Sequence, residues 1–347
     1  MKNADLYYVV ESSWTTLWDG IRITRSLNDQ NLIKASIAES TKLFRNKIIH
    51  FGSRPALSTI GGKLNLPHSS CKNILTWFHI NPEYTPNPDK KQINSIIDNI
   101  DRFDIIHTSC SITYDELISQ GFPKEKLIII PLGVDTRYFK PYKMKDREKI
   151  RDSLGIPKDS ICIGSFQKDG AGWGSGEDPK LVKGPDIFCK AVEKIASKNN
   201  IHCLLVGPAR GYVKNNLLKS GIPFTHKYSD KKHMPEIELP GYYNALDLYL
   251  VTSRVEGGPL ALVEAMACGI PVITTDVGMA RDIIIDGQNG FLVSEFKDIE
   301  DRIAKTFEDE FKKIDRTLYE KSSVKIASRL DTKIIASDYY NKIYSRL

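Results

Sequence analysis

The sequence predicts an α/β protein with two domains, each holding a parallel sheet flanked by helices. The chain has 347 residues, which is long enough for two separate cores. Short apolar runs alternate with helical stretches along its whole length, a pattern that favours parallel sheets. The rhythm breaks once, at the charged and poorly apolar segment 140–151, which we interpret as an interdomain connection.

The first domain is predicted over residues 1–140. Its expected strands cover residues 6–11, 47–51, 73–79, 103–107 and 127–131. Its expected helices include residues 20–27, 89–100 and 111–120.

The second domain, over residues 141–330, repeats the same alternation. Its expected strands cover residues 160–166, 201–206, 224–228, 246–252, 272–274 and 290–293. Residues 331–347 form an expected helix with one apolar face that crosses back to the first domain. Two such sheets predict a cleft between the domains, at the carboxyl ends of the strands, where ligands of these folds bind.

Composition places the chain among ordinary globular proteins. It is 41% hydrophobic and 27% charged, and its net charge of +6 allows an anionic partner without selecting one. The six cysteines form no Cys-x-x-Cys pair, which predicts reduced thiols and a cytoplasmic protein. The seven histidines show no ligand spacing, so no metal site is expected. No signal peptide and no apolar run of roughly 18 residues is found.

The most informative segment runs from Glu256 to Glu264. Pro259 suits the first position of a helix and Gly269 suits its left-handed end. Within the apolar helix, Glu264 is the only charged residue, and burying an unpaired carboxylate costs several kcal/mol or more. A ligand with two vicinal hydroxyls would suit its two oxygens. The alternative is that Glu264 pairs with an internal arginine such as Arg281, and that Glu256 is a solvated loop acid.

Two stretches of this domain favour an anionic ligand. Glu256, Gly257 and Gly258 form a loop before a helix, where free amides and the helix dipole attract negative charge. Lys183 likewise precedes a helix that begins near Pro185, so the lysine and adjacent amides could hold a diphosphate. The alternative for Lys183 is an ordinary solvated side chain.

Taken together, these segments resemble the retaining glycosyltransferases of family 4, which have the GT-B architecture of two facing Rossmann-like domains. The resemblance is distributed over about two thirds of the chain. It rests on Lys183 with Gly184 and on residues 130–141, 204–207, 243–247, 256–269 and 290–293.

The resemblance implies roles for individual residues. Glu256, Gly257 and Gly258 would contact the donor sugar, Glu264 would accept the ribose hydroxyls, and Lys183 would neutralise the diphosphate. Further donor contacts are expected from Pro259, Leu260, Lys168, Gly207, Tyr228 and Gly278. His79 resembles the histidine that the family places near the transferred sugar, although a structural histidine at a turn is the alternative. Neither a metal nor a further cofactor is implied.

The chain departs from the family pattern before Lys183. An arginine usually found there is absent, and a glycine-rich insertion at 170–176 takes its place. The second cation could therefore be Lys168, Lys180 or Arg254. The insertion itself could be a mobile lid over the donor or a flexible linker.

The expected activity is transfer of a hexose-type sugar from a nucleoside diphosphate donor to a hydroxyl acceptor, with retention. The alternatives are a GT-B-like sugar-nucleotide epimerase or hydrolase, and an inactive carbohydrate-binding scaffold. Nucleic acid is not an expected partner. The basic stretch 22–47 could attract an anionic membrane from the cytoplasmic side, or could be a solvated face.

Overall fold

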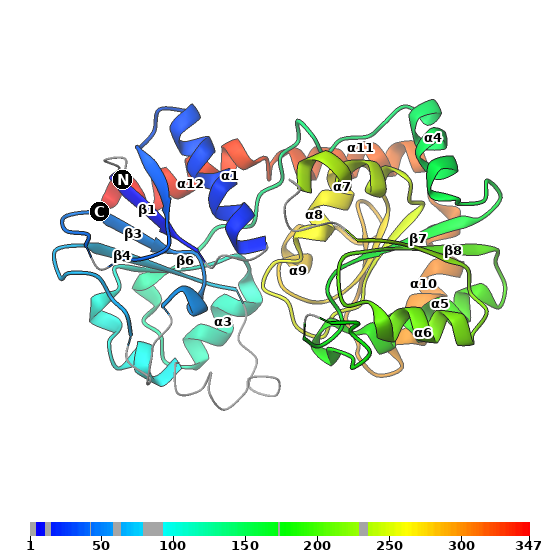
Figure 1. Ribbon diagram of the computed structural model, residues 1–347, viewed down its shortest axis with the longest axis horizontal. Coiled ribbons are helices and arrows are strands. Elements are labelled where there is room, and N and C mark those ends of the chain that lie inside the picture. The colour runs from blue at the N-terminus through cyan, green and yellow to red at the C-terminus, as the bar shows by residue number, and fades with distance from the viewer. Residues whose placement is uncertain are drawn as a thin grey trace. The chain divides into compact units, whose positions relative to one another are not determined.

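The computed structural model describes residues 5–10, 15–41, 43–57, 64–78, 93–172, 174–228 and 235–347. The chain divides into two compact units: Met1–Gly133 with Leu330–Leu347, and Val134–Arg329. Each unit holds a six-stranded parallel sheet with helices, so the predicted two-domain α/β fold is confirmed (Figure 1).

The sheet of the first unit has the strand order β2-β1-β3-β4-β5-β6. The strands are β1 (Leu6–Val9), β2 (Ala35–Ala38), β3 (Ile48–Phe51), β4 (Lys72–Trp77), β5 (Ile105–Thr108) and β6 (Leu127–Ile129). Five of these strands match predicted segments, whereas β2 was missed. Three of its four residues, Ser36, Ile37 and Ala38, are only partly buried, because β2 lies at the sheet edge and needs no apolar run.

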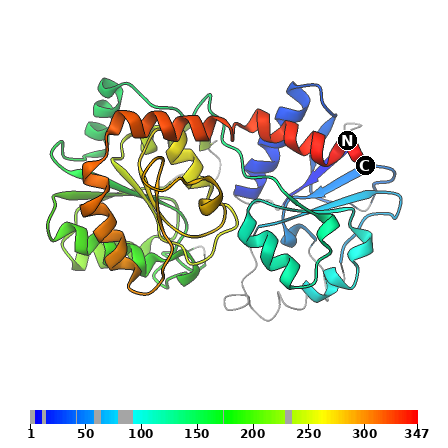
Figure 2. The same ribbon diagram turned by 180° about the vertical axis from the view of Figure 1, so that it is seen from behind.

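The helices of this unit include α1 (Thr15–Asp29), α3 (Ser111–Ser119) and α12 (Thr332–Lys342). Residues 93–97 are also helical, and short 3-10 turns lie at η1 (Arg54–Leu57), η3 (Ile100–Arg102), η4 (Lys124–Lys126) and η7 (Tyr344–Arg346). Helix α12 lies beside α1, as both views show (Figures 1 and 2). Gln30 joins them, since its amide nitrogen donates to the Lys333 carbonyl at 3.0 Å and its amide oxygen accepts from Ser337 at 3.0 Å.

A chain of hydrogen bonds runs through the buried centre of the first unit. His107 Nε2 faces the Ile130 carbonyl at 2.8 Å and must therefore carry the proton, which leaves Nδ1 to accept from Thr76 at 2.9 Å. The Thr76 oxygen then accepts from His50 Nε2 at 2.7 Å, and His50 Nδ1 accepts from Tyr344 at 2.7 Å. The chain thus ties η7 to the sheet with both histidines neutral.

The sheet of the second unit has the order β12-β11-β10-β7-β8-β9. Its strands are β7 (Ile161–Phe166), β8 (Ile201–Val206), β9 (Phe224–Lys227), β10 (Leu248–Val251), β11 (Val272–Thr275) and β12 (Phe291–Val293). From β7 the chain first builds outward to β9 and then returns to build from β10 to β12. The order reverses between β7 and β10, and ligands of open α/β sheets bind at the carboxyl ends beside such a reversal.

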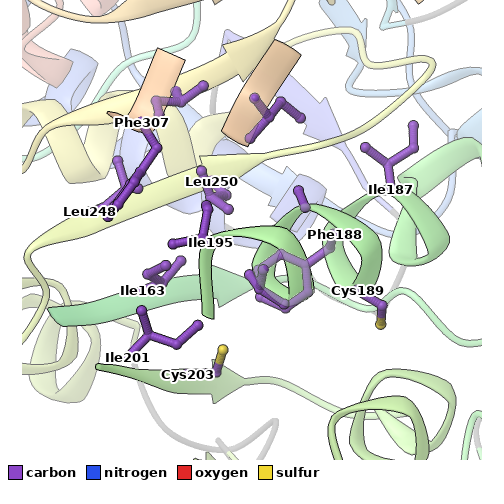
Figure 3. Packing of buried hydrophobic residues seen from close by; sticks show 14 of the residues in the cluster. Ile163, Ile187, Phe188, Cys189, Ile195, Ile201, Cys203, Leu248, Leu250 and Phe307 are labelled. Atoms are coloured by element: carbon purple, nitrogen blue, oxygen red, sulfur yellow. The ribbon is translucent and has the colours of Figure 1, made fainter. Parts of the chain in front are cut away.

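Helices cover both faces of the second sheet (Figure 1). They are α4 (Met144–Leu154), α5 (Pro185–Ala196), α6 (Gly211–Lys219), α7 (Pro235–Asn244), α8 (Leu260–Ala267), α9 (Ala280–Ile283), α10 (Ile299–Asp309) and α11 (Arg316–Ser328), with 3-10 turns η5 (Leu181–Lys183) and η6 (Phe311–Lys313). Figure 3 shows Phe188 and Ile195 of α5 among the buried side chains of Ile163, Cys203 and Leu250. This core fixes α5, and with it the turn that carries Lys183.

The segment 140–151, predicted to be an interdomain connection, lies within the second unit. Much of it forms α4, whose arginines bind the chain just before β10. Arg147 donates to the Asn244 and Leu246 carbonyls at 2.8 Å, and Arg151 pairs with Asp247 at 2.8 Å. Two of the charged residues that indicated a linker, Arg147 and Arg151, instead bind buried backbone carbonyls.

The histidine chain of the first unit predicts acid sensitivity. Burial lowers the pKa of His107 from 6.5 to about 4, and burial together with His107 lowers the pKa of His50. Burial raises the pKa of Asp19 from 3.8 to about 6 despite nearby Arg22, which acts in the opposite direction. Between pH 6 and 4 these two histidines bind two protons only in the unfolded chain, whereas Asp19 binds one only in the folded chain. These three groups together should therefore lower the free energy of unfolding by about 1.4 kcal/mol per pH unit in this window.

Urea unfolding at pH 7, 6, 5 and 4, followed by tryptophan fluorescence, measures this slope. In His107→Asn one of the two histidines that avoid protonation is gone, so the slope should become smaller by about 1.4 kcal/mol per pH unit. His68→Asn, which changes an exposed histidine of the same unit, should keep the parental slope. A slope that is the same in all three proteins would contradict the assignment.

Candidate active site

The predicted donor residues gather at the carboxyl ends of β7 and β10, beside the reversal of strand order. Residues 167–169 follow β7, residues 252–258 follow β10, and the turn η5 lies between β7 and α5. The loop after β11 is attached to the same place, because Thr275 Oγ1 donates to the Ser253 carbonyl at 2.6 Å. Four segments that are distant in sequence thus form one edge of the second unit.

Gly184 brings the Lys183 turn against the end of β10. Its φ is +61°, and a Cβ placed there would lie 1.8 Å from the Thr252 carbonyl oxygen, so only glycine fits. The contact is closed by Thr252 Oγ1, which donates to the Gly184 carbonyl at 2.9 Å. Backbone amides of Arg254 and Val255 also donate to the Val182 carbonyl, at 2.9 and 3.2 Å. The turn is therefore held at the end of β10 without any contribution from the Lys183 side chain.

Lys183 and Glu256, each predicted separately from the sequence, form an ion pair with Nζ and Oε1 2.6 Å apart. Ser253 Oγ donates to the same carboxylate oxygen at 2.8 Å. The two side chains are only 22% and 12% exposed, so solvent screens the pair less than it would a surface bridge. Glu256 is therefore not a solvated loop acid, and Lys183 is not a freely solvated cation.

Arg254, one of the three candidates for a second cation, has a structural role here. Its guanidinium forms two hydrogen bonds to Asp186, at 2.8 and 2.7 Å, and a third to the Leu181 carbonyl at 2.8 Å. Burial acts to raise the pKa of Asp186, but the Arg254 bonds outweigh it and the pKa lies below its ordinary value. Arg254 therefore anchors the first turn of α5 next to Lys183.

Lys168 and Lys180 lie within electrostatic range of the Lys183–Glu256 pair. Burial lowers the pKa of Lys180, the positive charges of Lys183 and Lys168 lower it further, and Glu256 opposes the shift. The charges of Lys168 and Lys183 therefore act on Lys180, and Lys183 is the lysine that contacts Glu256. Such an excess of positive charge favours a bound anion.

The glycine-rich insertion is neither a flexible linker nor a detached lid over its described length. Ser175 and Gly176 accept hydrogen bonds from the amides of Gly211 and Tyr212, both at 2.8 Å. Its other end is paired through a bridge between Gly170 and Pro179. Gly170 and Gly176 serve close packing, because a Cβ on either would lie 2.3 or 2.2 Å from the Ala209 carbonyl oxygen.

Glu264 lies on α8 and is 5% exposed. Tyr243 of α7 donates to its Oε2 at 2.9 Å, and burial together with the Glu264 charge raises the pKa of Tyr243. The protein thus supplies a hydrogen bond that the sequence argument had reserved for a ligand. Arg281, named as the alternative partner, donates to Asp276 at 2.8 Å.

Helix α8 begins at Leu260, so Pro259 precedes the helix and is not its first residue as predicted. The ψ of Pro259 is 89°, outside the helical range, which explains the shift by one position. Gly269 has a φ of +72°, the left-handed end that was expected. Leu260, as the first residue of the helix, is partly buried.

The remaining predicted residues differ in how they relate to this edge. Gly278 contacts the donor loop, since a Cβ there would lie 2.8 Å from the Gly257 carbonyl oxygen. Gly207, at the end of β8, adjoins Gln167 and so lies near Lys168 in the fold. Tyr228 follows β9 and is 61% exposed, and no contact with the other site residues is found in the described ranges. His79 lies outside the described residues.

Sequence reasoning missed three side chains that support the site. Tyr243 holds Glu264, Ser253 holds Glu256, and Asp186 holds Arg254. Tyr243 was inside a matching segment, and a buried tyrosine hydroxyl requires a partner, so that signal was present. The other two are ordinary polar residues whose partners depend on folding.

Clusters of metal ligands and membrane-spanning helices are both absent from the described residues. These residues contain no group of three or more histidine, cysteine, aspartate or glutamate side chains placed to hold a metal ion. Across the same ranges, every helix is too short or too polar for a membrane crossing.

A cavity of about 580 Å³ in the second unit lies away from the donor residues. Its lining includes Arg147, Arg151, Ser160 and Asp247, which precede β7 and β10 or lie on α4. It therefore opens at the amino ends of the strands, opposite the edge that carries Lys183 and Glu256.

The contact between Tyr243 and Glu264 predicts a stability effect. In Tyr243→Phe the carboxylate loses a buried hydrogen bond, so unfolding should require about 1–3 kcal/mol less free energy in urea titrations. Tyr242→Phe removes the neighbouring, partly buried hydroxyl and should change stability by less than about 0.5 kcal/mol. Equal effects in the two variants would show that the Tyr243 hydroxyl does not stabilise Glu264.

The second unit matches a known sequence family. Residues 179–323 match the profile described as Glycosyl transferases group 1. A D-inositol 3-phosphate glycosyltransferase of Xylanimonas cellulosilytica is 29% identical over 185 residues, which are 50% of this chain and 40% of that protein. The corresponding protein of Segniliparus rotundus is 31% identical over 50% of this chain and 36% of its own length. The chain thus spans less than half the length of these relatives.

Solved structures share the fold of the whole chain. Anabaena HepE in complex with UDP-glucose superposes with a TM-score of 0.73 at 19% identity, covering 99% of this chain and 100% of that one. A glycosyltransferase from Rickettsia africae gives a TM-score of 0.69 at 15% identity, with both chains fully covered. At these identities the likeness shows the fold, which is the GT-B arrangement of two Rossmann-like domains. Residues 179–323 match glycosyl transferases group 1 on that fold, and the resemblance to a GT-B glycosyltransferase that was inferred from the sequence is confirmed.

Proposed function

We propose that this chain is a retaining glycosyltransferase that moves a hexose-type sugar from a nucleoside diphosphate donor to a hydroxyl acceptor without a metal ion. The observation that carries the proposal is the Lys183–Glu256 ion pair, 2.6 Å long, at the strand-order reversal of the group 1 domain. This is the edge at which open α/β sheets bind ligands. HepE, which shares the fold, has been solved with UDP-glucose, so UDP-hexoses are the first donors to consider.

In the proposed donor complex, the diphosphate takes over Lys183 from Glu256. A diphosphate brings more negative charge than one carboxylate, and Lys168 and Lys180 add positive charge at the same place. Glu256 is then released to accept hydrogen bonds from the hydroxyl groups of the donor sugar, while Ser253 still donates to one of its oxygens. The pair thus keeps both groups oriented until the donor arrives.

The reaction itself would need little from the protein beyond charge and position. As the bond between the sugar C1 and the diphosphate oxygen breaks, negative charge grows on the leaving group, where Lys183 stabilises it. The acceptor oxygen forms its bond to C1 on the same face, and its proton passes to the leaving phosphate. For His79 we propose the role that the family resemblance implies, a position near the transferred sugar.

Glu264 is proposed to accept the hydroxyls of the donor ribose. Tyr243 already supplies a hydrogen bond to Oε2, so burial alone no longer demands a ligand. The proposed role rests instead on position: α8 starts directly after the Glu256–Gly258 loop, in contact with Gly278. In this arrangement Tyr243 orients the carboxylate that meets the ribose.

The proposed place of action is the cytoplasm, since all six cysteines are buried free thiols. Peripheral attachment to an anionic membrane would need a basic surface over residues 22–47. That surface exposes less positive charge than the sequence indicated, because Arg22 is buried and Lys47 pairs with Asp5 at 3.4 Å. Flotation with anionic vesicles tests the attachment.

A thermal-shift screen with UDP, GDP, ADP and their sugars tests the donor site. A diphosphate that binds only the folded protein raises its melting temperature, by an amount equivalent to about 2.7 kcal/mol at one hundred times its Kd. Glu264→Ala should remove the response. Lys183→Ala should reduce the turnover of the preferred donor about 100- to 1000-fold, because it removes a cation from the developing charge.

Lys158→Ala is the matched control, since Lys158 lines the cavity at the opposite edge of the same sheet. It should keep both the thermal response and the turnover. Full activity in Lys183→Ala would refute its role. Donor consumed without any acceptor would indicate the epimerase or hydrolase alternative, and donor bound but unchanged would indicate the scaffold.

A further inference from the structure

Arg210, which precedes α6, lies buried with 1% exposure and joins the ends of two strands. Its Nη1 donates to the Ser165 carbonyl at 2.6 Å, the Gln167 carbonyl at 3.0 Å and the Val206 carbonyl at 3.1 Å. Its Nη2 donates to Ser165 Oγ at 3.0 Å. The guanidinium therefore fixes the backbone from which residues 168–180 leave β7.

Asp169 completes this arrangement. It is fully buried, and its Oδ2 lies 3.0 Å from Arg210 Nη2. Burying two charges is costly unless they are paired, so breaking this pair would leave one of them uncompensated inside the protein. Asp169 directly follows Lys168 in the chain, although neither Asp169 nor Arg210 belongs to the predicted donor contacts.

Residues 168–180, which we term the insertion hairpin, are closed at their base by backbone bonds. The amide of Lys180 donates to the Asp169 carbonyl at 2.7 Å, and the amide of Ala171 donates to the Asp178 carbonyl at 2.8 Å. At the tip, Ser175 and Gly176 accept from the first amides of α6. The hairpin is thus closed at its base by its own backbone and held at its tip by Gly211 and Tyr212, which follow Arg210.

The base of the hairpin also continues into the Lys183 turn. The Lys180 carbonyl accepts from the Lys183 amide at 2.8 Å, and Gln167 Nε2 donates to the Lys183 carbonyl at 3.0 Å. Asp169, Lys180 and Lys183 are therefore linked in one short run of backbone bonds. A shift of Asp169 would move Lys180 before it moved Lys183, which Gly184 and Arg254 hold independently.

We propose that the buried Arg210–Asp169 pair is a positioning device that holds Lys180 beside Lys183, so that Lys180 supplies the second cation for the diphosphate. The assignment rests on the proposed function of the same site. It gives the insertion a role, since the base of the hairpin joins Lys180 to the turn that carries Lys183. Asp169 and Arg210 act through Lys180 and do not themselves touch the donor.

A double-mutant cycle on UDP affinity tests the coupling. Lys180→Met should weaken UDP binding about tenfold in calorimetry, the loss of one charge-assisted contact. Asp169→Asn should weaken it to a similar extent, and the double variant should be no weaker than either single variant. Lys180→Arg, which keeps the charge, should retain most of the affinity. Losses that add in the double variant, or an unchanged affinity in Asp169→Asn, would overturn the proposal.

Asp247→Asn is the matched control, because Asp247 pairs with Arg151 at 2.8 Å at the other edge of the sheet. It should lower the melting temperature while leaving UDP affinity unchanged. If Asp169→Asn does not fold, Gly176→Ala replaces it. That change displaces the hairpin tip from Ala209 without altering any charge, and it should weaken UDP binding only while Lys180 is present.

A second measurement separates this proposal from the donor assignment. The pKa of Lys180, followed by ¹³C NMR of its side chain, should rise toward its ordinary value in Asp169→Asn as Lys180 moves away from Lys183 and Lys168. Loss of the Asp169 charge without movement would lower it instead, and that result would overturn the proposal. A protein that bound no nucleoside diphosphate, yet showed the rise, would refute the donor role alone.

Discussion

The close approach of Gly184 to the end of β10 is the constraint on which the site depends. Because no side chain fits at this position, the turn before α5 can lie directly on the backbone that leads to Glu256. The Lys183–Glu256 ion pair is a consequence of that approach, and Arg254 with Asp186 secures it from the side of the helix. Two side chains 73 positions apart are thereby brought within hydrogen-bonding distance.

Charge is distributed unevenly around this pair. Lys183 pairs with Glu256, and the charges of Lys183 and Lys168 act on Lys180, whereas the second acid, Glu264, is kept apart by its contact with Tyr243 on α7. A site of this kind favours a ligand whose phosphates and hydroxyls are separated by several bonds. The two carboxylates therefore perform different tasks although they belong to one short segment, since one is tied to a cation and the other to a neutral phenol.

Much of this could be read from the sequence because it depends on local patterns. Alternating apolar runs gave eleven of the twelve strands. Glycine and proline marked the ends of α8 to within one residue, and the acid-bearing loop was evident from composition. Strand β2 was missed because an edge strand needs no apolar run, and α4 was mistaken for a linker because its charges bind carbonyls that only folding brings near.

The parts of the site that were not predicted share a physical reason. Tyr243, Ser253 and Arg210 act through partners more than two residues away, and for Ser253 and Arg210 nothing in the neighbouring sequence indicates which partner that is. The insertion hairpin shows the same limit. Its glycines indicated flexibility, whereas two of them, Gly170 and Gly176, pack closely against Ala209.

The hydrogen-bond chain of the first unit has a consequence for sequence variation. Every donor from Tyr344 through His50 and Thr76 to His107 points the same way, toward the Ile130 carbonyl. Replacing one member with a group of opposite polarity would place two donors or two acceptors face to face. Homologues should therefore exchange these residues in concert, so that positions on β3, β4, β5 and the C-terminal turn co-vary in an alignment.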